Sequence, residues 1–188
     1  MANDTRQELL DASELLMKFH GYHGFSYANI AERVGIKKAS IHHHFAAKCD
    51  LAAESVRRYR GQIREILDQI CEEESEPQDR LRRFADIFLG AYRGEGSMCL
   101  CAALTADWES LPEGVRDEVQ SYWDESRAWL GDALFPNRSS ANEPRITSTA
   151  NAIISVLEGA LLCARVDSSD QALKDAANAA ALLLKQDG

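Results

Sequence analysis

The stretch that decides the fold is Ser26–Leu51, which reads SYANIAERVGIKKASIHHHFAAKCDL. Ser26 is a favourable N-cap for a short helix that carries Ile30. Gly35 breaks that helix, because glycine tolerates the backbone conformations found at helix ends. A second short apolar set follows the glycine, and a longer helix begins near Lys48. Two short helices joined by a tight turn predict a helix–turn–helix, whose second helix enters the major groove of DNA.

Helical periodicity extends over the rest of the chain. Leu9, Ala12, Leu16 and Phe19 recur at three- and four-residue steps and predict an amphipathic helix that ends near Gly21. Further helices are expected over 48–73, 81–92, 98–108, 112–130, 145–165 and 169–185, with loops at 94–97 and 136–144. The fold class is therefore all-α with about nine helices. We expect a helix–turn–helix domain at 1–50 and a second helical domain at 51–188.

The charge of the chain is unevenly distributed. The 188 residues carry a formal net charge of -9, which taken alone argues against a nucleic-acid partner. Residues 1–60 hold nine basic and seven acidic side chains, net +2, whereas residues 61–188 hold 12 and 23, net -11. The window Arg33–Lys48 contains four Lys or Arg and three His but no acid. This asymmetry predicts a basic contact surface on an acidic body.

The sequence carries no signal for export or membrane insertion. Its first residues form no apolar signal core, and no run reaches the roughly 18 strongly apolar residues of a transmembrane helix. Five Cys, an odd number without framework spacing, argue against a secreted disulfide scaffold. We therefore expect a cytoplasmic protein.

Three polar residues mark the start of the second short helix. Lys37, Lys38 and Ser40 stand where the side chains of a helix–turn–helix reach the edges of bases. The positive charge of the two lysines attracts DNA phosphates. The residues themselves thus indicate double-stranded DNA as a partner.

The same residues resemble the signature of the TetR family of one-component transcriptional regulators. The signature is matched by Ser26, Ile30–Ala31, Gly35–Ile36, Lys38–Ile41, His42–Phe45 and Lys48. The resemblance covers about residues 5–55, and spacing, turn and residue types agree together. It implies a ligand-responsive, homodimeric repressor that binds a palindromic operator and is released by a small, mainly apolar or electrophilic effector. It also implies that 51–188 is an all-helical ligand-binding and dimerisation domain.

The resemblance implies a role for each DNA-binding residue. Ser26 and Tyr27 contact the DNA backbone, Lys48 holds a phosphate, and the groove-facing residues are Lys37, Lys38, Ser40 and His43. One position departs from the family, because His42 stands where a Tyr commonly bonds a phosphate. A protonated His would strengthen that bond. DNA affinity is therefore expected to rise below about pH 6.5, near which an ordinary histidine takes up a proton.

The last two helices are expected to form the dimer. The segment 153–163 is apolar nearly all round, so more than one of its faces must be buried. The alternative is a core helix that packs only within its own chain. The resemblance favours a four-helix bundle between two chains, with these interface residues: Ile153, Leu157, Ala160, Leu161, Ala164, Ala176 and Ala180.

The middle helices are expected to enclose the effector, as the resemblance implies. The candidate walls are apolar or aromatic, as in most ligand sites: Phe88, Tyr92, Met98, Cys99, Leu104, Trp108, Trp123 and Trp129. Any one of them can equally be a plain core residue. No cluster of basic residues marks an anionic ligand, so a mainly apolar or aromatic effector is expected.

Two cysteines are candidate redox residues. The segment Met98–Leu104 resembles a narrower TetR subgroup in which a Cys-Leu pair occurs in repressors that sense electrophiles or oxidants. Cys99 at the start of a helix, and Cys49 beside Lys48, are placed where a thiol can become reactive. The alternative is that each is an inert, buried hydrophobe.

Other classes of function find little support. The sequence has no nucleophile elbow, phosphate-binding glycine loop or helical His-Glu-x-x-His pair, so an enzyme and a cofactor are not expected. Three adjacent histidines on a helix cannot converge on one metal ion. The remaining alternative is an all-helical protein-interaction module without DNA binding.

Overall fold

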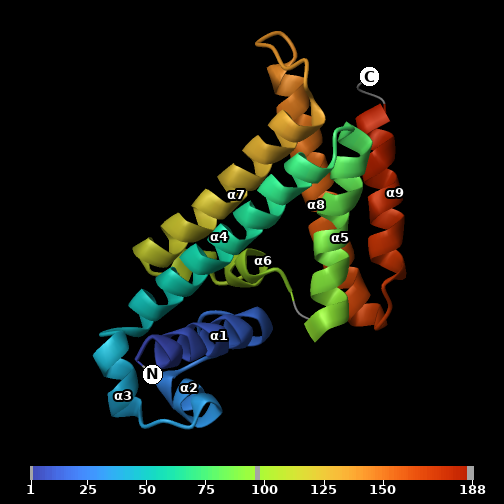
Figure 1. Cartoon of the computed structure of the whole chain (residues 1–188). Coiled ribbons are helices and arrows are strands. Elements are labelled where there is room, and N and C mark those ends of the chain that lie inside the picture. Colours follow the sequence, from blue (N-terminus) through green and yellow to red (C-terminus); the bar gives the residue numbers. More distant parts are fainter. Residues whose placement is uncertain (1, 96–97, 186–188) are drawn as a thin grey trace. The chain divides into compact units, whose positions relative to one another are not determined.

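The computed structural model describes residues 2–95 and 98–185, in which the regular elements are helices and no strand occurs, and this confirms the all-α prediction (Figure 1). The helices of this part of the chain are α1 (Ala2–His20), α2 (Tyr27–Val34), α3 (Lys38–His44), α4 (Lys48–Glu73), α5 (Pro77–Glu95), α6 (Leu100–Thr105), the 3₁₀-helix η1 (Trp108–Ser110), α7 (Glu113–Leu134), α8 (Glu143–Asp167) and α9 (Gln171–Lys185). Residues 96–97 of the expected loop lie outside the described residues.

The chain forms two compact units, each built from two segments. Unit 1 comprises Met1–Ile63 and Leu100–Tyr122, and unit 2 comprises Arg64–Cys99 and Trp123–Gly188. The helices α4 and α7 each contribute one part to either unit. The expected boundary near residue 50 between a DNA-binding and a second domain stays a prediction. The compact units divide the chain at other positions.

Unit 1 is organised around α1. This helix packs against α2 and α6, and α2 packs in turn against α3. Its apolar stripe places Leu9 and Met17 wholly inside, where they join Phe25, Ile30 and Ile41. Burial of side chains of this size stabilises the fold by about 1.5–3 kcal/mol each, which offsets the conformational entropy that is lost when α1, α2 and α3 become ordered.

A buried carboxylate joins two long helices within unit 1. Glu118 of α7 is only 8% exposed, and its Oε1 accepts a hydrogen bond of 2.8 Å from Nε of Arg57 on α4. Arg60, one helical turn further along α4, lies 2.8 Å from the other carboxylate oxygen. Burying a carboxylate is costly unless it is paired, so these two arginines fix the register of α4 against α7.

Unit 2 is a bundle in which α8 packs against both α9 and α5, and α5 also packs against α9 (Figure 1). By length and composition α8 is the single helix in the described residues that could cross a membrane. Its buried residues pack against the two neighbouring helices, whereas Leu162 and Val166 on the same helix are exposed.

The structure differs from the sequence prediction at two places. The apolar segment expected as one helix over 98–108 is broken into α6 and η1, with Asp107 between them. The expected loop at 136–144 ends early, because α8 begins at Glu143 and Pro144 occupies its first turn. Proline suits that position, since its missing N–H would be unpaired there anyway.

Two glycines provide a matched test of unit 1. A Cβ at Gly24 would collide with the carbonyl oxygen of His20, whereas a Cβ at Gly61 in α4 meets nothing within 4 Å. We expect Gly61→Ala to raise the free energy of unfolding by about 1 kcal/mol, because alanine is the better helix former. Gly24→Ala should lower it by about 1–3 kcal/mol. Urea unfolding measures both, and shifts of the same sign would contradict this packing.

Candidate nucleic-acid interface and ligand region

The second helix is defined by a cap at each end. Ser26 has extended backbone, and its Oγ accepts a hydrogen bond of 3.4 Å from the backbone N–H of Asn29. Gly35 has φ of 76°, in the left-handed region, and donates its N–H to the carbonyl of Ala31 at 2.9 Å. Because a side chain is strained in that conformation, glycine permits the tight turn that leads into α3.

Tyr27 ties the start of α2 to the end of α3. Its hydroxyl donates a hydrogen bond of 3.0 Å to the carbonyl of Phe45, and its ring meets His42 edge-on at 4.9 Å between centroids. Burial, together with the charges of Asp50 and Cys49, raises the pKa of Tyr27 to about 12, so the hydroxyl keeps its proton. Tyr27, expected to contact DNA, thus also holds the two helices together.

The outer side of α3 is basic and accessible. Lys37, Lys38 and His43 are exposed, and Ser40 is half-exposed. The opposite side presents Ile41, which is fully buried. The structure therefore places the four predicted groove-facing residues on or beside one short helix whose apolar side is anchored in unit 1.

The hydrogen bond of His42 determines which of its nitrogens is free. Nδ1 lies 3.3 Å from the carbonyl oxygen of Ala46. A carbonyl only accepts hydrogen bonds, so this contact assigns the proton of the neutral ring to Nδ1. Nε2 then has only a lone pair, which cannot donate to a phosphate. Protonation of the ring supplies an N–H at Nε2 while the Nδ1 bond is retained.

Lys48 begins α4 against two aromatic rings. Its Nζ lies 4.4 Å from the ring centroids of both Tyr22 and Phe25. Burial lowers the pKa of Lys48, and the charge of Asp107 acts in the opposite direction. Cation–π contacts of this kind orient the ammonium group. The lysine that is predicted to hold a phosphate is therefore positioned by aromatic rings of the α1–α2 turn.

An acidic residue that the sequence pattern does not single out anchors this turn. Asp107 accepts a hydrogen bond of 2.8 Å on Oδ2 from the backbone N–H of Tyr22. Nearby, Nε2 of His23 lies 2.9 Å from Oγ of Ser110. Gly21 has φ of 67°, and a Cβ there would come within 2.7 Å of the same Oδ2. An isolated Asp in a polar turn gives no sequence signal for such a contact.

The predicted effector residues divide between the two units. Leu104 is buried and Trp108 half-buried in unit 1. Unit 2 holds the other six, of which Phe88, Met98 and Cys99 are buried, whereas the half-buried ones are Tyr92, Trp123 and Trp129. Trp129 stacks on Phe84 at 5.5 Å and donates its indole N–H to the carbonyl of Leu67 at 3.2 Å. These contacts give Trp129 a packing role within the bundle.

All five cysteines lie within the described residues, and none of them forms a disulfide there. Cys99 is 4% exposed and adjoins the carboxylate of Glu158 on α8. Cys49 is half-buried, and its Sγ lies 3.7 Å from the carboxylate of Asp50. Each of the two candidate redox residues thus has a carboxylate as a close neighbour. Among the described residues no His, Cys, Asp and Glu side chains form a metal-binding group of three.

The residues expected at the dimer interface lie inside unit 2. Ile153, Leu157, Leu161, Ala164 and Ala180 are fully buried, while Ala160 and Ala176 are 9% and 6% exposed. A side chain covered within its own chain has no surface left for a partner. The apolar surface that α8 and α9 do expose consists of Leu162, Val166 and Leu182, at 56%, 84% and 60%. Helical periodicity alone could not separate the inner stripe of these two helices from the outer one.

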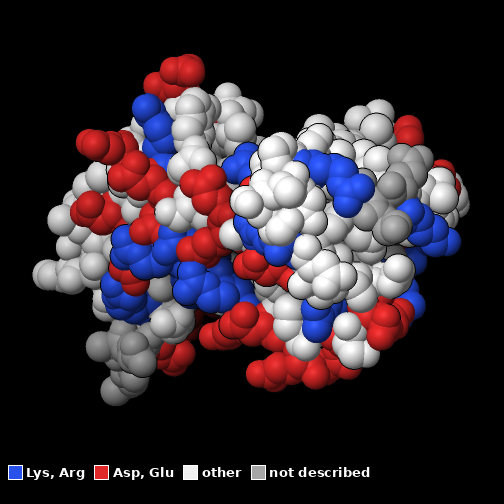
Figure 2. All heavy atoms as spheres, turned by 90° about the horizontal axis from the view of Figure 1, so that it is seen from above, with Lys and Arg blue, Asp and Glu red and all other residues white. Residues whose placement is uncertain are grey.

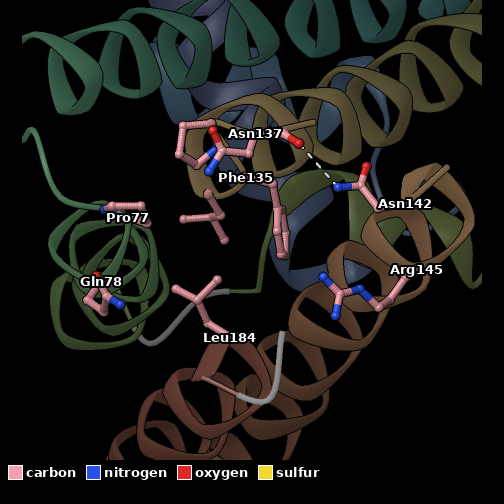
Figure 3. A pocket seen from close by; sticks show the side chains of 9 residues that line it. Pro77, Gln78, Phe135, Asn137, Asn142, Arg145 and Leu184 are labelled. Atoms are coloured by element: carbon pink, nitrogen blue, oxygen red, sulfur yellow. Dashed lines mark hydrogen bonds between the residues drawn. The ribbon is translucent and has the colours of Figure 1, made fainter. Parts of the chain in front are cut away.

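Unit 2 also has a surface pocket that the sequence did not reveal. It has a volume of about 320 Å³, and Phe135 and Leu184 point toward its centre (Figure 3). Its other walls are Pro77, Gln78, Leu134, Pro136, Asn137, Asn142 and Arg145. The amide of Asn142 donates to the carbonyl of Asn137 at 3.2 Å, which closes one side. Prolines and loop amides in the sequence indicate turns, so they gave no sign of a pocket.

Ion pairs account for part of the acidic surface. Acidic and basic side chains are interspersed on the face in Figure 2. In unit 2, Arg64 contacts Glu125 at 2.6 Å and Arg93 contacts Asp170 at 2.5 Å. Exposed pairs of this type contribute little stability, but an arginine that is paired with an acid is less available to bind another anion.

Comparison with known proteins finds two family models that match the chain. Residues 9–54 match the model described as bacterial regulatory proteins, tetR family. Residues 77–179 match the C-terminal domain described as transcriptional regulator LmrA/YxaF-like. No curated protein matches the chain significantly.

Solved structures of similar architecture cover almost the whole chain. A TetR transcriptional regulator from Legionella pneumophila is 31% identical over 94% of this chain and 95% of its own, with a TM-score of 0.88. A TetR-family regulator from Agrobacterium tumefaciens is 26% identical over 99% and 98%, also with a TM-score of 0.88. The reduced form of NemR from E. coli, 22% identical over 94% and 95% with a TM-score of 0.79, shares the fold.

The anchor of the α1–α2 turn can be tested by amide exchange. Asp107→Ala removes the acceptor of the Tyr22 N–H. We expect the protection of that amide to fall about tenfold, the equivalent of one hydrogen bond to a charged group. Glu109→Ala, two residues away in η1, is the control and should leave the amide unchanged. Equal protection of Tyr22 in both variants would show that Asp107 does not hold the turn.

Proposed function

Because the chain belongs to the TetR family of bacterial transcriptional regulators, we propose that it is a cytoplasmic, ligand-responsive repressor that binds a palindromic operator as a homodimer. Proteins of this family are DNA-binding transcription factors and not enzymes. The observation that carries the proposal is the exposed basic side of α3, which the Tyr27–Phe45 hydrogen bond and buried Ile41 hold against unit 1.

The proposed contacts divide between groove and phosphates. Lys37, Lys38, Ser40 and His43 are exposed or half-exposed and can reach base edges when α3 lies in the major groove. At the start of α2 and of α4, Ser26, Tyr27 and Lys48 can contact phosphates. Phosphate contacts fix the register of the protein on the duplex, whereas contacts to base edges select the sequence.

The proposed dimer uses the exposed stripe of α8 and α9. Leu162, Val166 and Leu182 form an apolar surface of the kind that marks a contact site. Packing these helices against their copies would make a four-helix bundle, with buried residues such as Leu157 and Leu161 supporting it from within each chain. A two-fold dimer would place its two α3 helices about 34–36 Å apart, which is one turn of the duplex.

Release from DNA requires a ligand that favours a different state of the dimer. Asp107 is the proposed link, because its N–H bonds the carbonyl of Leu104 at 3.0 Å while its carboxylate holds Tyr22. Leu104 and Trp108, two of the expected effector contacts, flank it. A small, mainly apolar or electrophilic effector that displaces α6 or η1 would therefore disturb the turn on which Lys48 rests.

Operator binding distinguishes this proposal from a helical protein-interaction module without DNA binding. Fluorescence anisotropy with promoter DNA of its own gene should show affinity that falls steeply as salt rises. Lys38→Ala should weaken binding and reduce the slope of log affinity against log salt by about 1 for each lysine removed. The control is Lys174→Ala on α9, whose ammonium pairs with Asp170. Binding that ignores salt and Lys38 alike would favour the interaction module.

His42 predicts a dependence of DNA affinity on pH. Since only the protonated ring can donate from Nε2, DNA affinity should rise as the pH is lowered. His42→Gln should remove this rise, whereas His20→Gln at the end of α1 should keep it. The same titrations measure it, and a parent and a His42→Gln variant with matching pH profiles would disprove the contact.

Cys99 is the proposed target of an electrophilic effector. Treatment with N-ethylmaleimide should release the parent protein from operator DNA, because the added group cannot fit in a position that is 4% exposed. Cys99→Ser should stay bound under the same treatment, and Cys163→Ser, which alters an exposed thiol, should respond as the parent does. Release of the Cys99→Ser protein would assign the response to another residue.

A further inference from the structure

A carboxylate without a cationic partner lies inside unit 2. Both oxygens of Glu158 on α8 are shielded from solvent, and within the described residues the neighbouring group that favours their charge is the neutral thiol of Cys99. Buried acids in proteins are normally paired with a cation or held by donors. Glu118 in unit 1, which receives two arginines, illustrates that rule. Glu158 departs from it.

The surroundings of Glu158 explain why its charge is costly. Burial raises the pKa of Glu158 to about 7, and the neighbouring Cys99 thiol, which favours the ionised form, offsets only part of that effect. The preceding Leu157 and the nearby Met98 are buried and apolar. The described ion pairs of unit 2 use their arginines on other acids, such as Arg93 on Asp170.

The backbone of α8 is accessible at the residue that follows Glu158. Gly159 follows Glu158, and a Cβ built on it would meet nothing within 4 Å. Gly159 is also half-exposed, so the site is not sealed on that side. A buried acid that lacks a cationic partner and lies beside buried apolar side chains is suited to a ligand that supplies the missing positive charge.

We propose that Glu158 anchors an effector that carries a protonated amine on an apolar body. This inference rests on the proposed function and names the chemical class of the effector. The ammonium group would donate charge-assisted hydrogen bonds to the two carboxylate oxygens, and the apolar body would lie against residues such as Met98 and Cys99.

The carboxylate discriminates between ligands of one shape. A carboxylate ligand would be repelled, and an alcohol could donate only one neutral hydrogen bond. An ammonium group gains a charge-assisted bond, which corresponds to about 10- to 100-fold in affinity over its neutral isostere. The mainly apolar effector expected from the sequence is thereby narrowed to a cationic amphipathic one.

Three probes with one skeleton test the inference on the full chain. Calorimetric titrations without DNA would compare 4-phenylbutylamine, 4-phenylbutan-1-ol and 4-phenylbutyrate. We expect the amine to bind at least about tenfold more tightly than the alcohol, and the carboxylate to bind least. Glu158→Gln keeps the size of the side chain and should abolish the preference for the amine. Glu109→Gln, in exposed η1, is the matched control and should retain it.

The outcomes separate this inference from the proposed function. Equal affinities of amine and alcohol, no amine binding at millimolar concentration, or a preference that survives in Glu158→Gln would each overturn the effector class. Should Glu158→Gln not fold, Glu158→Leu replaces it, and the comparison of probes on the parent protein decides independently. Failure of the unliganded parent protein to bind operator DNA would refute the repressor, and the amine titrations would still stand.

Discussion

The hydrogen bond from the Tyr27 hydroxyl to the carbonyl of Phe45 is the contact on which the geometry of the helix–turn–helix depends. The helices α2 and α3 have eight and seven residues, too few to be stable alone. Their relative orientation therefore comes from this bond, the left-handed turn at Gly35 and the buried Ile30 and Ile41. These contacts fix the orientation of the two helices and, with it, the direction of the exposed lysines at the start of α3.

A second set of contacts connects that base to the segment between α6 and α7. Asp107 holds the backbone of Tyr22, and the Tyr22 ring in turn carries the ammonium of Lys48. In the proposed mechanism the same residues bear on both DNA affinity and its control by the effector. In unit 2 the buried Glu158, which has no cationic partner, destabilises the chain, and in our proposal a cationic ligand supplies the missing charge.

Sequence and structure agree where a signal is local. Ser26, Gly35 and the apolar spacing of Ile30 and Ile41 encode caps, turn and core within a few residues, so the helix–turn–helix could be predicted. Contacts between distant residues could not. Nothing near Asp107 marks it as the acceptor for Tyr22, 85 residues away, and periodicity alone could not assign Leu162 to the surface and Leu161 to the core. The overall charge of -9 misleads about the DNA partner for a related reason, since it sums the basic residues 1–60 with the acidic residues 61–188.

The most direct test of a dimeric repressor is a hydroxyl-radical footprint on promoter DNA of its own gene, combined with the native mass of the complex. The account predicts two protected segments related by two-fold symmetry, with centres about 34–36 Å apart, on a duplex that carries two chains. A single protected segment with one chain, or equal protection of a scrambled duplex, would contradict it.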